Sequence, residues 1–285
     1  MIRNTIAGSV VNGTVSYLLD TRREVVPYRS RPAEERRLER WLAGAAPMSV
    51  LLVHGAGGSG KTRLANAFAG FAHEQGWAVA QAVEAASTAV PGQVVADAAP
   101  VLVVVDYAER WGADGLLRMI GALPVDFPGR AVRVLLLARS GAIWPALADR
   151  LDRLPSELPE PIGLGDLVPP ADRPRAFADA VDAFARALGR TGGVDAVPDL
   201  SAEEYGSALT LHMAALAAAY EGRPGLADLS DYLLRHEGRF WPVEDRGAAA
   251  DVVLLATLFG PLEPAAAREL LGRAGTRALL DWHVG

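Results

Sequence analysis

Almost continuously apolar runs alternate with amphipathic segments over the first part of the chain. The runs at 49–54, 101–105 and 132–138 have the length of strands, whereas 61–75 and 116–122 carry helical patterns. Apolar strands separated by helices are typical of a parallel sheet that is covered on both faces. The pattern therefore predicts an α/β fold. It also predicts strands at 77–83 and 161–164, and helices at 32–43, 92–98 and 145–154.

After about residue 168 the strand pattern stops and alanine-rich helical patterns follow. Helices are predicted at 173–189, 201–220, 226–237, 248–258 and 264–280. We therefore expect an α/β domain over 25–168, followed by an α-helical lid domain over 169–285. The last segments could begin a winged-helix region, but their mixed charges form no basic stripe.

The first residues carry a different signal. Within 5–19 the dipeptide Asn12-Gly13 lies between two runs rich in β-branched residues. Asn-Gly in this setting is the strongest short-range sign of a two-residue hairpin turn. We therefore predict an N-terminal β-hairpin segment over 1–24, whose role the sequence leaves open.

Composition excludes several classes of protein. Of the 285 residues, 51% are hydrophobic and 22% are charged, which is ordinary for a globular protein and excludes wholesale disorder. No apolar run approaches the roughly 20 residues of a membrane span, and the first residues lack the apolar stretch of a secretory signal. Cysteine is absent, which excludes disulfides and thiolate metal sites. We expect a cytoplasmic protein without a membrane partner, and the net charge of −6 makes nucleic acid an unfavourable partner.

A glycine-rich motif carries the sharpest chemical signal. The octapeptide GAGGSGKT matches GxxxxGK[ST], follows an apolar strand and opens a helix, as a phosphate-binding loop requires. Its residues are Gly55, Ala56, Gly57, Gly58, Ser59, Gly60, Lys61 and Thr62. Lys61 is the only lysine among 28 basic residues, and a compact ammonium suits the outer phosphates better than a wide guanidinium. We expect Lys61 to bind the phosphates and the Thr62 hydroxyl to ligate Mg²⁺.

Three further candidates follow predicted strands. Asp106 ends the run VLVVVD, where a carboxylate would hold Mg²⁺ directly or through water. Glu109, three residues later, is equally well interpreted as a general base that polarises water or as a solvated side chain. Arg139 follows the 132–138 run and is interpreted as a sensor of the γ-phosphate, with a surface ion pair as the alternative.

With these motifs in hand, the chain resembles the STAND class of P-loop ATPases, related to AAA+, NACHT and NB-ARC modules. The resemblance covers roughly 25–285 and is carried by VVPYRSRPAEERRLERWL, GAGGSGKTRLA, VVVDYAER, LLLARS, ALTLHMAAL and YLLRHEGRFW. It implies that Tyr28 lies near the adenine and that Arg31 and Arg63 lie near the nucleotide. It also implies that His212 lies on a lid helix near the phosphates, although a packed helix residue is an equal alternative. The chain departs from the family at Thr210, where a proline is frequent.

The resemblance implies a nucleotide-gated signalling switch. ADP would hold a closed form, and exchange for ATP would open it and promote self-association. A sensor or effector partner is also implied, which the sequence does not identify. Hydrolysis would be slow unless a partner chain supplied an arginine. ATP is favoured over GTP because the usual NKxD guanine reader needs a second lysine. The alternatives are a P-loop kinase acting on a small molecule and a scaffold that binds nucleotide without catalysis.

Overall fold

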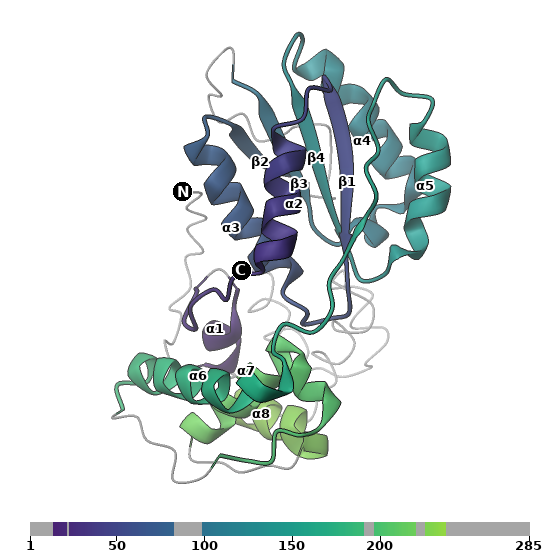
Figure 1. Cartoon of the computed structure of the whole chain (residues 1–285). Helices are drawn as coiled ribbons and strands as arrows, with labels where there is room; N and C mark the ends of the chain where they lie inside the picture. Colours follow the sequence, from purple (N-terminus) through teal and green to yellow (C-terminus); the bar gives the residue numbers. More distant parts are fainter. Residues whose placement is uncertain (1–13, 22, 83–98, 191–196, 221–225, 238–285) are drawn as a thin grey trace, which may run out of the picture. The chain divides into compact units, whose positions relative to one another are not determined.

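The computed structural model describes residues 14–21, 23–82, 99–190, 197–220 and 226–237 (Figure 1). The described residues divide into two compact units. The α/β unit comprises Pro27–Arg173 and Leu200–Thr210, and the helical unit comprises the described residues of Met1–Val26, Pro174–Asp199 and Leu211–Gly285. The helices predicted at 92–98, 248–258 and 264–280, and with them the winged-helix region, lie outside the described residues.

A five-stranded parallel sheet forms the centre of the α/β unit, with the order β2-β3-β4-β1-β5. The strands are β1 (Met48–His54), β2 (Ala78–Ala82), β3 (Val101–Val105), β4 (Val132–Ala138) and β5 (Ile162–Gly163). Every residue of β3 and β4 is buried, which explains why their sequences lack polar alternation. The predicted α/β fold and its strands are confirmed.

Helices cover both faces of this sheet (Figure 1). Alternate residues of β1 point to opposite faces: Leu51 and Val53 share a core with α2 (Pro32–Leu42) and α3 (Lys61–Glu74). Val50 and Leu52 share the other core with α4 (Gly112–Asp126) and α5 (Trp144–Leu151). The core residues of α2 are Leu38, Trp41 and Leu42. The sheet therefore holds its strand ends rigidly between two packed layers.

One arginine is buried inside this sheet. Arg133 is the second residue of β4, and its guanidinium donates to the backbone oxygens of Trp41, Gly44 and Ala46 at the end of α2 and just after it. Burial lowers the pKa of Arg133, and Glu157 partly opposes this effect. The guanidinium therefore joins the end of α2 and the loop that follows it to the sheet.

The helical unit contains α1 (Val15–Leu19), most of α6 (Arg173–Ala187) and of α7 (Ala208–Ala219), and α8 (Leu229–Glu237). The single helix predicted over 201–220 is wrong in its first part. Residues Glu203–Gly206 form a separate 3₁₀ turn, and Ser207 is extended before α7 begins. The break forms because the Gly206 carbonyl accepts from the amide of Leu167 instead of continuing a helix.

The second strand of the predicted N-terminal hairpin is also wrong, because Val15–Leu19 is helical. The Thr14 hydroxyl accepts from the Tyr17 amide at 3.2 Å and so caps the helix. Val15 and Leu18, three residues apart, are buried on one face, and α1 packs against α8. The Asn12-Gly13 turn lies outside the described residues. In the part of the chain that the structure describes, no helix has both the length and the apolar character to cross a membrane.

Candidate functional site

The phosphate loop joins β1 to α3 at the carboxyl end of the sheet. Gly58 and Gly60 have φ values of 77° and 90°, which glycine adopts without strain. No side chain caps the first turn of α3, so its amides remain available to an anion. A strand, a GxxxxGK[ST] loop and a helix in this arrangement make up the P-loop motif. The loop therefore has the conformation that its sequence predicted.

Lys61 is folded back across this loop. Its Nζ donates to the backbone oxygens of Gly55 at 2.7 Å and Ala56 at 3.0 Å. Burial lowers the pKa of Lys61, while Asp106 and Glu109 raise it. The amine is therefore held within the loop and close to two carboxylates.

Thr62 and Asp106 are brought together from α3 and from the end of β3. The Thr62 hydroxyl donates to Asp106 Oδ2 at 2.9 Å, and Asp106 Oδ1 accepts from the Tyr107 amide at 2.9 Å. A hydroxyl and a carboxylate are the hard oxygen ligands that Mg²⁺ prefers. Among the described residues no cluster of three or more His, Cys, Asp or Glu could hold a metal. A two-ligand site completed by phosphate and water suits Mg²⁺, which usually keeps several waters.

Glu109 and Arg139 follow the neighbouring strands β3 and β4. Glu109 lies in the 3₁₀ turn Ala108–Arg110, and its Oε1 is 4.0 Å from Arg139 Nε. The Arg139 side chain is 60% exposed. Glu109 Oε2 and Ser59 Oγ are buried, and neither has a hydrogen-bond partner within the described residues. Two buried polar atoms without hydrogen-bond partners, both at the carboxyl end of the sheet, are what a site for a polar ligand would leave when that ligand is not bound.

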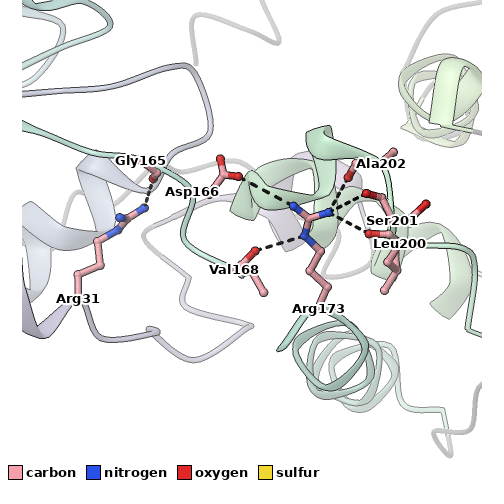
Figure 2. Close-up of polar contacts among 8 residues, drawn as sticks. All are labelled: Arg31, Gly165, Asp166, Val168, Arg173, Leu200, Ser201 and Ala202. Atoms are coloured by element: carbon pink, nitrogen blue, oxygen red, sulfur yellow. Dashed lines mark hydrogen bonds and ion pairs between the residues drawn. The ribbon is translucent and has the colours of Figure 1, made fainter. Parts of the chain in front are cut away.

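Arg31, directly before α2, contacts the phosphate loop. This residue is only 7% exposed, and its guanidinium donates to the backbone oxygen of Ser59 at 2.8 Å. It also donates to the backbone oxygen of Gly165 at 2.9 Å (Figure 2). The Tyr28 hydroxyl donates to Glu35 at 2.7 Å, and burial together with Glu35 raises the pKa of Tyr28. Arg31 thus supports the loop backbone. The adenine contact of Tyr28 stays a prediction.

The segment Ser207–Leu209 lies against the same loop. Ser207 Oγ and the Leu209 amide donate to the Gly58 carbonyl at 3.4 and 3.3 Å. A Cβ atom on Gly58 would meet Leu209 Cβ at 2.5 Å, so the two backbones approach closely. Only the resemblance of ALTLHMAAL to a lid segment pointed towards this contact.

Arg173 holds the chain that leads into that segment (Figure 2). Only 3% of the residue is exposed, and its guanidinium donates to four backbone oxygens, with Asp166 Oδ2 at 3.9 Å. The acceptors are Val168 at 3.3 Å, Leu200 at 3.0 Å, Ser201 at 3.3 Å and Ala202 at 2.7 Å. Arg173 therefore joins residues 166–168 to 200–202. The sequence carried no signal for it, because it is one arginine among many and its acceptors are main-chain groups.

Two predicted nucleotide contacts stay untested. His212 belongs to the helical unit, where its ring packs edge to face with Phe184 at 6.3 Å between centroids. Arg63 is half-buried in the first turn of α3. Their roles near the phosphates remain predictions.

Comparisons with known proteins find distant similarities of fold. No protein-family model matches the sequence, and no curated protein matches it. Among solved structures, the chain is similar to the ORC1 protein of Aeropyrum pernix in complex with DNA, at 17% identity and a TM-score of 0.46, over 91% of this chain and 80% of that one. The ORC2 protein of Aeropyrum pernix, in ADPNP–ADP complexes, gives 16% identity and a TM-score of 0.44, over 87% of this chain and 82% of that one.

AMPPCP-bound DnaA from Aquifex aeolicus gives 13% identity and a TM-score of 0.41, over 90% of this chain and 89% of that one. Similarities this distant decide nothing about what this chain binds. Its chemistry rests on the geometry of its own residues.

Proposed function

We propose that this chain binds ATP with Mg²⁺ and hydrolyses it slowly. The observation that carries the proposal is the pairing of the Thr62 hydroxyl with Asp106 at 2.9 Å, beside a phosphate loop that contains the only lysine of the chain. A glycine turn formed for structural reasons alone would not need a carboxylate from a separate strand at that hydroxyl.

The loop and Lys61 would bind the phosphates. The Lys61 amine would exchange its bonds to the Gly55 and Ala56 carbonyls for bonds to the outer phosphate oxygens. Thr62 and Asp106 would hold Mg²⁺, which neutralises charge on the β- and γ-phosphates when bound. The loop amides and the ammonium supply the rest of the positive field.

Glu109 supports hydrolysis rather than binding alone. Its buried Oε2 lacks a hydrogen-bond partner within the described residues and could accept a proton from a water molecule. The water oxygen would bond to the γ-phosphorus as the bond to the β-phosphate oxygen breaks. Arg139, 4.0 Å from Glu109, would stabilise charge on the transferred group.

A nucleotide-gated switch with self-association in the ATP state is the finer part of the proposal. Its support is the contact of Ser207 and Leu209 with the Gly58 carbonyl. A change at the phosphate loop would act directly on this segment, in which α7 begins. The sedimentation coefficient with ADP and with a non-hydrolysable ATP analogue tests this step, and equal values would contradict it.

The single lysine provides a direct test of binding. An amine-reactive ester should acylate Lys61, whose lowered pKa favours the neutral amine, and peptide mass spectrometry locates the adduct. MgATP should protect Lys61 from the reagent, while adenosine should not. Calorimetry should show that Lys61→Ala weakens ATP binding by at least about a hundredfold, or 2.7 kcal/mol. No protection and no heat with any nucleotide would overturn the proposal.

Turnover is tested separately. Glu109→Gln should bind ATP as the parent does and release phosphate at least about tenfold more slowly. Parent-like turnover by this variant would remove Glu109 from the mechanism. Binding without any turnover in the parent would favour the non-catalytic scaffold, and a phosphorylated small-molecule acceptor would favour a kinase.

A further inference from the structure

Tyr107 has a backbone conformation that side chains other than glycine rarely adopt. Its φ and ψ are 53° and 47°, and it directly follows Asp106. Among the described residues only one other non-glycine residue, Glu24, has a positive φ. Strain of this kind persists only where the surrounding structure imposes it, and it gathers at functional sites.

The strained backbone fixes the Asp106 carboxylate. The Tyr107 amide donates to Asp106 Oδ1 at 2.9 Å, and the left-handed conformation of Tyr107 lets the chain enter the Ala108–Arg110 turn without drawing this amide away. The other oxygen, Oδ2, is thereby left to the Thr62 hydroxyl at 2.9 Å. One carboxylate is held at both oxygens, and its position depends on the left-handed conformation of the next residue.

The Tyr107 ring contacts two arginines. The guanidinium of Arg110 lies 4.5 Å from the ring centroid and that of Arg139 lies 5.9 Å from it. Both lie within cation–π range. The residue is 43% exposed, so it does not belong to the core. A cation–π contact uses the face of the guanidinium and leaves its N–H groups for a phosphate.

We propose that Tyr107 is a positioning residue with two separable parts. Its backbone conformation holds the Asp106 carboxylate in position, and its ring holds the Arg139 guanidinium in position. The inference rests on the proposed ATPase function. A merely structural side chain with this exposure would affect neither metal-linked binding nor turnover when truncated.

Three substitutions separate the two parts. Tyr107→Gly keeps access to positive φ and removes the ring, Tyr107→Val disfavours the left-handed conformation and removes the ring, and Tyr107→Phe keeps both features. Calorimetry with a non-hydrolysable ATP analogue, with Mg²⁺ and with EDTA, gives the Mg²⁺-linked gain in affinity. Steady-state phosphate release gives kcat and KM.

The expected results differ among the variants. Tyr107→Gly should keep the Mg²⁺-linked gain within about threefold of the parent, while kcat falls about two- to fivefold at unchanged KM, the factor expected for one exposed cation–π contact. Tyr107→Val should lose about tenfold of the Mg²⁺-linked gain as well, with affinity in EDTA unchanged. Tyr107→Phe should behave as the parent. A parent-like kcat for Tyr107→Gly would overturn the role of the ring, and a full Mg²⁺-linked gain for Tyr107→Val would overturn the role of the backbone.

A nucleotide-free measurement distinguishes failure of this inference from failure of the proposed function. Phenylglyoxal modifies arginine, and peptide mapping follows each site. Arg139 should react about two- to fivefold faster in Tyr107→Gly, the factor that loss of one exposed cation–π contact gives. Arg150, which pairs with Asp114 on the surface, is the internal control and should be unchanged. An unchanged rate at Arg139 would refute the ring contact, whether or not the parent binds ATP.

Discussion

Three glycines of the phosphate loop permit a quantitative test of how closely the loop and the 207–209 segment are packed. Gly57 has a negative φ, and a Cβ built on it meets nothing within 4 Å. Gly60 has a φ of 90° and equally open surroundings. Gly58 has a φ of 77°, and its Cβ would lie 2.5 Å from Leu209 Cβ and 2.9 Å from Ser207 Oγ. The three alanine variants therefore separate backbone strain from steric overlap.

The magnitudes follow from these surroundings. Gly57→Ala should change the free energy of unfolding by less than about 0.5 kcal/mol. Gly60→Ala should cost about 1 kcal/mol, since only the left-handed conformation opposes it. Gly58→Ala should cost about 3 kcal/mol, because overlap with a Cβ that cannot rotate away adds about 2 kcal/mol to the same strain.

Urea denaturation of the nucleotide-free protein, followed by circular dichroism, measures all three variants. Equal m-values would show that the same surface unfolds in each case. The order Gly57→Ala, Gly60→Ala, Gly58→Ala in increasing cost is the expected result. A cost for Gly58→Ala equal to that of Gly60→Ala would refute the close contact between the loop and Leu209.

Two further predictions concern buried and paired polar groups. Arg173→Met should lower the free energy of unfolding by about 3 kcal/mol, because four backbone oxygens lose their donor, whereas Arg150→Met at an exposed pair should cost under about 1 kcal/mol. Similar midpoints for these two variants in urea would contradict the role given to Arg173. Burial raises the pKa of Glu35, but hydrogen bonds from Ser30, Arg31 and Tyr28 outweigh it and hold the pKa below the ordinary 4.5. A carboxyl group whose pKa is lower in the folded state stabilises the fold at pH values above its unfolded-state pKa, and this contribution is lost as the pH falls. The difference in free energy of unfolding between the parent and Glu35→Gln should therefore shrink as the pH falls below about 4.5. Urea midpoints between pH 3 and pH 7 measure this difference, and a constant difference would contradict the assigned shift.

The sequence by itself determined the parts of the molecule whose causes are local. The strands were predictable because β3 and β4 are buried on both faces and show this as continuous apolar runs. The phosphate loop was predictable because its glycines, lysine and hydroxyl are consecutive in the chain. Asp106 and Arg139 were placed at one edge because parallel strands all end on the same side.

Local pattern failed where packing decided the conformation. The β-branched residues near the start favoured a hairpin, yet Val15 and Leu18 gain burial as a helix. The helical pattern over 201–220 did not reveal the break at Ser207, because the cause is the distant amide of Leu167. Intrinsic helix and strand propensities differ by at most about 1 kcal/mol per residue among residues other than proline, so burial and long-range hydrogen bonds easily override them.

Only the tertiary structure decided how the site is supported. Arg31 reaches Gly165, which is 134 positions away in the chain, and Arg173 reaches four main-chain oxygens. Every residue has a backbone carbonyl, so the acceptors leave no trace in the sequence. The chain thus encodes its phosphate chemistry in consecutive side chains, whereas the arginines that hold this chemistry in place acquire partners only when folding brings distant backbone segments together.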